Sequence, residues 1–144
     1  MGTAERLLVV VLRAVGLVAC LAIVPTLMPL NWMAVVHEHL GLGTLPDGPI
    51  VEYLARSLSG MYAFHGGLFL LASADVRRYA PLVIYSGATA LLGGIGLLAL
   101  DLSLGMPWWW TAGEGPFVTL LGLVILVLQR GVSAASDKSP AKRA

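Results

Sequence analysis

The sequence predicts an all-α membrane protein: a bundle of four transmembrane helices with both termini in the cytoplasm. Three observations predict it, namely the scarcity of charge, four long apolar segments, and the places where the basic residues fall. Hydrophobic residues make up 58% of the 144 residues and charged residues only 12%. Because a soluble domain is nearer half apolar and a quarter charged, this composition indicates a chain that lies mostly within a bilayer.

Four segments have the length that a membrane crossing needs. A helix takes roughly 20 apolar residues to cross the hydrocarbon core, and a bare backbone finds no hydrogen-bond partner in lipid. We therefore expect helices at about residues 7–30, 50–73, 81–104 and 111–129. They would form a single domain over residues 1–130, followed by a polar, disordered cytoplasmic tail at 131–144.

The basic residues fall on one side of this arrangement. Those outside the expected helices, or close to their ends, are Arg6, Arg13, Arg77, Arg78, Arg130, Lys138, Lys142 and Arg143. The only other one is Arg56, and residues 31–49 and 105–110 contain none. By the positive-inside rule, both termini and residues 74–80 are cytoplasmic. Four crossings also return the chain to its starting side, and the expected location is the bacterial inner membrane.

The first external link contains an unusual polar triplet, His37-Glu38-His39. Residues 32–40 are expected to lie along the outer surface as an amphipathic segment, with the apolar side chains dipping into the bilayer and the triplet meeting water. There the histidine charge would respond to external pH. A metal site is the alternative, but it needs an extended backbone, because on a helix the two histidines point about 200° apart.

Other polar groups gather at the outer ends of the expected helices. A central Arg, Lys or Asp costs roughly 2.5–3.5 kcal/mol on insertion scales, so each needs a reason. Glu52 and Arg56 are four residues apart on a helix and close enough to pair. Asp101 and Glu114, near the outer ends of the third and fourth helices, are expected to join them. Two interpretations stay open: a structural ion-pair network, and a site for an anionic or polar ligand around Arg56.

The second expected helix also carries a ribbon of small residues, spaced by four, that would let a neighbouring helix approach closely. Its members are Ala55, Ser59, Ala63 and Gly67. His65 lies in the inner half of this helix, on roughly the opposite side from Arg56. A lone histidine there favours an interhelical hydrogen bond. The alternative is axial ligation of haem or a proton relay. His37 and His39 lie near the other surface and cannot supply a second ligand at the same depth, so no cofactor is assigned.

Several function classes find no support in the sequence. Cys20 is the only cysteine, which excludes an internal disulfide and a multi-cysteine metal site. The glycines of residues 86–98 follow no strand and precede no lysine, so they do not predict a nucleotide-binding loop. No Ser/His/Asp arrangement predicts catalysis, and no basic stripe predicts nucleic acid as a partner. The sequence therefore favours a non-enzymatic protein.

Two stretches carry a resemblance: residues 54–82, LARSLSGMYAFHGGLFLLASADVRRYAPL, and residues 101–117, DLSLGMPWWWTAGEGPF. They resemble small bacterial four-helix inner-membrane proteins that are DoxX-like in size and topology. The shared features are an arginine early in the second helix, an Arg-Arg-Tyr link and an acidic residue opening the fourth helix. The resemblance implies the architecture and carries over no activity. Residues 37–39 have no counterpart in it.

These observations predict a non-enzymatic binding or accessory subunit with an outward-facing polar mouth around Glu52 and Arg56. One alternative is a haem- or quinone-associated redox protein that uses His65. The other is a small-solute or proton-coupled transporter that acts as an oligomer. The expected partners are the lipid bilayer and either a second copy of the chain or a larger membrane complex. A simple ion pair predicts that exchanging Glu52 and Arg56 rescues what either single change destroys.

Overall fold

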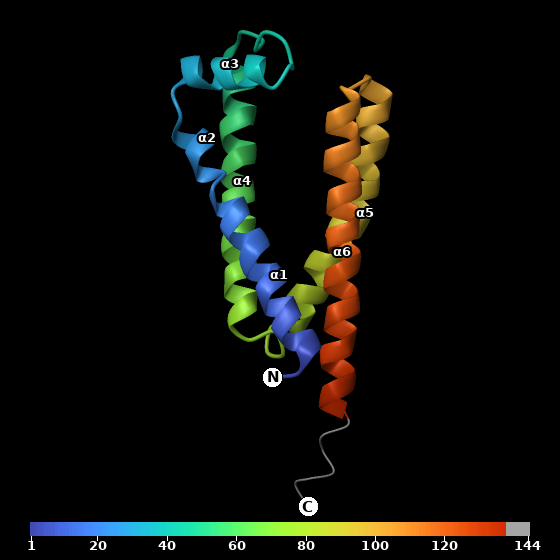
Figure 1. The fold of residues 1–144 in the computed structure, drawn as a ribbon. Coiled ribbons are helices and arrows are strands. Elements are labelled where there is room, and N and C mark those ends of the chain that lie inside the picture. The colour runs from blue at the N-terminus through green and yellow to red at the C-terminus, as the bar shows by residue number, and fades with distance from the viewer. Residues whose placement is uncertain (138–144) are drawn as a thin grey trace, which may run out of the picture. The chain divides into compact units, whose positions relative to one another are not determined.

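The computed structural model describes residues 1–137, which form helices and no strand (Figure 1). The helices are α1 (Thr3–Cys20), α2 (Ile23–Leu27), α3 (Leu30–His39), α4 (Pro49–Ala74), α5 (Ala80–Leu104) and α6 (Trp108–Asp137). The predicted all-α class is confirmed. The part of the expected tail at residues 138–144 lies outside the described residues.

Three segments of the described chain are long and apolar enough to cross a membrane. They are Thr3–Leu27, Ala80–Leu104 and Trp108–Ala135, and they indicate a membrane protein. The 26-residue α4 is not among them. It is long enough, but it carries Glu52, Arg56 and His65 within its apolar sequence.

The first expected crossing, at residues 7–30, is interrupted twice. Pro25 has no N–H to donate to the carbonyl of Leu21, and its ring clashes with that carbonyl in a continuous helix. The backbone N–H of Val24 bonds this carbonyl instead, at 2.9 Å, and α1 gives way to the short α2. Pro29, in an extended conformation, then separates α2 from α3. The expectation of one helix through both prolines was wrong. Residues 32–39, for which the sequence left the backbone conformation open, are helical.

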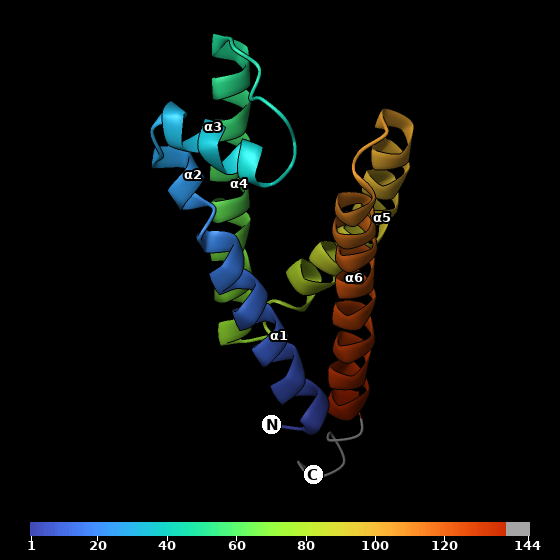
Figure 2. The ribbon, with the colours of Figure 1, turned by 45° about the horizontal axis from the view of Figure 1, so that its top comes forward.

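The described chain divides into two compact units, and each is considered by itself. One consists of residues 13–70, with the end of α1, then α2, α3 and most of α4. The other consists of residues 1–12 and, within the described chain, residues 71–137, with the start of α1, the end of α4, then α5 and α6. Within the first unit, α3 runs across the N-terminal end of α4 rather than along it (Figures 1 and 2).

The second unit is built on an antiparallel pair, α5 and α6. Gly105 ends α5 in the left-handed conformation (φ 65°), which glycine adopts without steric cost. The next N–H, of Met106, bonds the Asp101 carbonyl at 3.0 Å and closes the end of the helix. The Pro107 carbonyl then accepts the first N–H bonds of α6, from Trp110 and Thr111. The reversal between the two helices is therefore complete within residues 105–107.

Glycines bring α5 and α6 into backbone contact. They recur every seven residues, at Gly87 and Gly94 on α5 and at Gly115 and Gly122 on α6. A Cβ at Gly115 would lie 2.7 Å from the backbone nitrogen of Leu98, and a Cβ at Gly122 would collide with the backbone of Leu91. Small residues at this spacing allow two membrane helices to pack closely along their length.

The other end of this unit ties α1 to the link before α5. Arg77 makes a two-pronged contact with Glu5, with Nε 3.2 Å from Oε1 and Nη2 3.0 Å from Oε2. The hydrogen bond to Glu5 and then its negative charge raise the pKa of Arg77, so the guanidinium stays charged. Asp75 fixes the link itself, because its Oδ1 accepts the backbone N–H groups of Arg77 and Arg78.

The same end explains why α6 continues to Asp137, beyond the residue where the sequence predicted a disordered tail. Val132 is buried, at 2% exposure. A Cβ on Gly131 would come within 3.1 Å of the Ala4 side chain of α1. Packing against α1 therefore keeps these small residues in a helix. The expectation of a disordered tail was wrong for residues 131–137.

The glycine contacts predict a position-specific cost for a single methyl group. Gly122→Ala is expected to destabilise the α5–α6 pair by about 1–3 kcal/mol, because its methyl group meets backbone rather than a flexible side chain. The matched control is Gly93→Ala on α5, where a Cβ would meet nothing within 4 Å. Denaturant titration of the purified protein in detergent measures both. Equal stability of the two variants would contradict the close backbone packing.

Candidate functional site

Arg56 connects α4 to the end of α2. Its Nη1 donates to the backbone carbonyl of Thr26 at 2.8 Å. Thr26 lies in the last turn of α2, where carbonyls have no partner within the helix. Lipid offers no replacement donor, and Pro29 lacks an N–H. Arg56 therefore satisfies a carbonyl that the interruption of the first crossing exposes.

Glu52 balances the charge of Arg56 one turn earlier on α4. Its Oε1 accepts Arg56 Nε at 2.9 Å and lies 2.8 Å from Nη2. The side chains of Arg56 and Glu52 are 30% and 38% exposed, so the pair lies at the margin of the unit. All three guanidinium nitrogens are thus engaged, two by the carboxylate and one by the carbonyl. This arrangement favours a structural role for Arg56 over an anion site built on it.

The contact between the first crossing and α4 continues below this pair. The Thr26 hydroxyl lies 3.2 Å from the Ala22 carbonyl and 3.4 Å from the Arg56 carbonyl, so its single proton can serve either. Lower down, the Cys20 thiol donates to the Ala63 carbonyl at 3.7 Å. At Gly66 a Cβ would come within 2.7 Å of the Cys20 backbone nitrogen.

This contact face differs from the expected ribbon of small residues. Gly60, Ala63 and Gly66 face α1 and α2, and only Ala63 belongs to the ribbon. At Gly67 a Cβ would meet nothing within 4 Å. The four-residue spacing identified the helix that makes the contact. The face that makes it, however, is rotated around α4 from the face of the expected ribbon.

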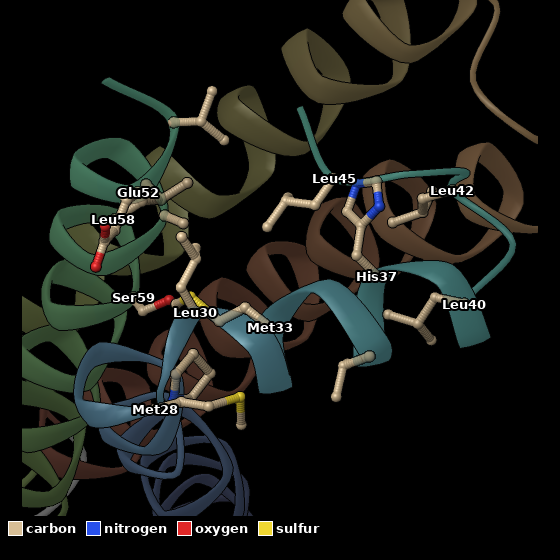
Figure 3. A pocket seen from close by; sticks show the side chains of 14 residues that line it. Met28, Leu30, Met33, His37, Leu40, Leu42, Leu45, Glu52, Leu58 and Ser59 are labelled. Carbon is tan, nitrogen blue, oxygen red and sulfur yellow. The ribbon is translucent and has the colours of Figure 1, made fainter. Parts of the chain in front are cut away.

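A cavity of about 280 Å³ lies where α2, α3, the 40–45 loop and the start of α4 meet (Figure 3). Its lining is mainly aliphatic, from residues such as Met28, Met33, Leu40, Leu45, Val51 and Leu58. The polar members of the lining are His37, Glu52 and Ser59. The expected ribbon residues Ala55 and Ser59 line this cavity instead of meeting a helix. An apolar cavity with a few polar groups is typical of a small-molecule site.

The histidines of the triplet hold backbone rather than metal. His37 Nδ1 lies 3.0 Å from the Gly43 carbonyl, and His39 Nδ1 lies 3.0 Å from the Val35 carbonyl. Because a carbonyl only accepts, Nδ1 carries the proton in both rings. His37 thereby pins the loop after α3, and Figure 3 shows its ring between Leu42 and Leu45.

The backbone conformation of the triplet does not fit the alternative of a metal site at His37 and His39. Such a site requires an extended backbone, and residues 37–39 belong to the helix α3. Within residues 1–137, no group of three or more His, Cys, Asp and Glu side chains could hold a metal ion. Glu38 is exposed on the surface of α3.

His65 bonds its own helix. Its Nδ1 lies 2.9 Å from the Met61 carbonyl, which again places the proton on Nδ1. The expected interhelical bond is therefore replaced by a bond within α4. The Phe64 ring meets the imidazole edge-on at 6.2 Å between centroids. Nε2 remains as the single atom with which His65 can bind something else.

Asp101 and Glu114 belong to the other compact unit, where each has its own surroundings. Asp101 is 5% exposed, and its Oδ2 has no hydrogen-bond partner among the described residues. Glu114 Oε2 accepts the indole N–H of Trp110 at 2.6 Å. The structure thus contains the Glu52–Arg56 pair, and the four-residue cluster stays a prediction.

Comparison with protein-family models, with curated proteins and with solved structures found no match. The DoxX-like resemblance therefore stays a proposal that rests on residues 54–82 and 101–117. Sequence reasoning overlooked the Thr26 carbonyl, and it placed Asp47 near the outer surface without assigning it to the site. Asp47 is exposed and has no hydrogen-bond or ion-pair partner among residues 1–137. The signal for the carbonyl was present, since Pro25 and Pro29 flank Thr26 and each removes a backbone donor.

Because Arg56 also donates to the Thr26 carbonyl, exchanging Glu52 and Arg56 is no longer expected to restore stability. Arg56→Ala is expected to cost about 1.5–3 kcal/mol, the range for hydrogen bonds to charged groups. The double exchange Glu52→Arg with Arg56→Glu keeps an ion pair, but the carboxylate introduced at position 56 cannot donate to the Thr26 carbonyl. It is therefore expected to remain close to Arg56→Ala in stability.

Arg56→Lys is the matched control, because an ammonium group keeps both the charge and the donors. It is expected to retain most of the stability. Thermal unfolding in detergent, followed by circular dichroism, compares the variants. A double exchange as stable as Arg56→Lys would mean that the Thr26 contact contributes nothing.

Proposed function

We propose that this chain is a multi-pass protein of the bacterial inner membrane, with four crossings and both termini in the cytoplasm. It acts as a non-enzymatic binding or accessory subunit. Its recognition element is the outer end of the unit formed by residues 13–70. The observation that carries the proposal is the apolar cavity beside the Glu52–Arg56 pair.

The length and internal bonding of α4 support it as the fourth crossing. At about 1.5 Å per residue, its 26 residues span about 39 Å, more than the roughly 30 Å of hydrocarbon. Bonds within α4 lower the free-energy cost of placing its polar side chains in the membrane. Glu52 and Arg56 pair, Ser57 bonds the Leu54 carbonyl, and His65 bonds the Met61 carbonyl. The basic link at Arg77 and Arg78 favours a cytoplasmic end for α4.

The construction of the cavity supports binding rather than catalysis or transport. Its polar groups are few and lie among aliphatic side chains, an arrangement that orients a ligand. Arg56, the only cation in α4, is already engaged by Glu52 and Thr26. A site of this kind holds a molecule without a group poised to transform it.

The four-crossing topology predicts which residues react with a membrane-impermeant maleimide on intact cells. In a Cys20→Ala background, cysteines at Asp47 and Met106 should react from outside, and those at Gly2 and Arg78 only after permeabilisation. If α4 does not cross, Asp47→Cys and Arg78→Cys will react from the same side. That result would remove the fourth crossing.

The binding role predicts a bound molecule in native mass spectrometry after release from a mild detergent. A defined extra mass should be present in the wild-type protein and lost in Ala55→Phe, which fills the cavity. Val35→Phe on the exposed side of α3 is the control and should keep the mass. An extra mass that only His65→Ala removes would favour the redox alternative. A wild-type protein that carries only bilayer lipid, equally in all variants, would contradict the binding role.

A further inference from the structure

A second cavity adjoins the apolar one at the outer end of the same unit. It also has a volume of about 280 Å³ and is lined by residues of α3, the 45–48 loop and the start of α4. Leu30, Leu45 and Glu52 line both cavities, so the two share a wall. The second is the more polar, with Asn31 and Asp47 in its lining. The pair therefore consists of an apolar cavity beside a mainly apolar one that has more polar groups in its lining.

The charged side chains that line these cavities are both carboxylates. The two linings contain the carboxylates of Asp47 and Glu52 and no Lys or Arg. Arg56 lines neither cavity, because its guanidinium is turned to Thr26 and Glu52. Across residues 13–70, the carboxylates Glu38, Asp47 and Glu52 and the guanidinium groups of Arg13 and Arg56 leave a net charge of −1 with neutral histidines. Because Arg56 balances the charge of Glu52, Asp47 is the lining carboxylate whose charge has no counterpart among residues 1–137, and a cationic group is the complementary ligand for it.

Both carboxylates have acceptor capacity to spare. Asp47 is exposed and makes no hydrogen bond or ion pair with any described residue. Glu52 uses Oε1 for both contacts with Arg56, and its Oε2 has no partner within residues 1–137. A cationic group can therefore approach without breaking the Glu52–Arg56 pair.

The volume restricts the apolar part of the ligand. Each cavity is close to the lower end of the roughly 300–1,000 Å³ range of small-molecule sites. One short alkyl chain or a compact apolar group fits such a space, and a two-chain lipid does not. A phospholipid would also bring its phosphate towards the carboxylates.

We propose that these two cavities bind a single-chain amphiphilic organic cation. The alkyl part occupies the apolar cavity beneath α3, and the ammonium group lies in the second cavity against Asp47 and Glu52. This inference rests on the proposed binding role and specifies the chemistry of its ligand.

Photolabelling of the protein in phosphatidylcholine nanodiscs tests the proposal. Three probes carry the same diazirine-bearing alkyl chain and end in a trimethylammonium, a sulfate or a hydroxyl group. The ammonium probe is expected to label peptides that contain residues 28–45, above the level reached by the other two. Asp47→Asn should weaken this labelling about two- to fivefold, as for loss of one exposed ion pair. Ala55→Phe should abolish it.

Glu38→Gln is the matched control, because it removes a carboxylate at the same end that lines neither cavity. It should leave labelling unchanged. Asp47 has no internal contact, so its variant tests charge without a threat to folding. Equal labelling by the ammonium and sulfate probes, or equal loss in Glu38→Gln and Asp47→Asn, would overturn the proposal.

The outcomes separate this inference from the proposed function. If the hydroxyl probe labels residues 28–45 as strongly as the ammonium probe, and Ala55→Phe abolishes both, the cavity binds but does not select charge. The cation proposal then fails and the binding role stands. If no probe labels the cavity and native mass spectrometry finds no bound molecule, both fail.

Discussion

The hydrogen bond from Arg56 to the Thr26 carbonyl is the contact on which the arrangement of α2, α3 and the start of α4 depends. A membrane segment interrupted by proline leaves backbone carbonyls without donors, and the bilayer supplies none. The guanidinium reaches across from α4 to one of these carbonyls at 2.8 Å. An arginine placed there brings its own cost, which Glu52 offsets through two further contacts. The ion pair is therefore a consequence of the broken helix, not an independent feature.

The two compact units solve the problem of helix packing by different means. In the pair of α5 and α6, the helices approach until a Cβ at Gly94, Gly115 or Gly122 would meet backbone. Dispersion contacts along such a seam need no polar group. In residues 13–70, a Cβ would come within 3.0 Å of a neighbouring backbone at Gly16 and Gly66, whereas at Gly60 it would meet only the Thr26 side chain, at 3.8 Å. Around Thr26, hydrogen bonds and an ion pair replace close backbone packing, and the space between the elements is not filled.

The sequence predicted those features that depend on local periodicity and charge. The helical class, the apolar segments at 81–104 and 111–129, and the four-residue spacing of Glu52 and Arg56 needed only composition and helix geometry. The prediction from the sequence failed where tertiary contacts hold a segment of polar composition in a helix. The residues after Arg130 look like a polar tail, but contact of Gly131 with Ala4 and burial of Val132 keep them helical.

The candidate site shows a similar division. The pairing partner of Arg56 was readable from the sequence, but which carbonyl accepts from it was not, because that depends on how α2 and α4 pack. Pro25 and Pro29 did indicate that some carbonyl there must lack a donor. The cavity was beyond prediction, since it depends on the direction in which α3 leaves α2. The small-residue ribbon marked the correct helix, and only the structure shows which of its members face a cavity and which face a neighbouring helix.

The prolines connect the stability of this unit to its cavities. Had the first crossing continued straight from Leu21 to Leu30, its side chains would have packed along α4, and no carbonyl would have needed Arg56. The interruptions at Pro25 and Pro29 instead turn α3 across the end of α4. Two crossed elements touch over a shorter length than two parallel ones, and Met33, His37 and Leu45 border the remaining space without filling it. The same break that creates the unsatisfied carbonyl thus opens the cavity, and this explains why the carboxylate that balances Arg56 also stands in the cavity wall.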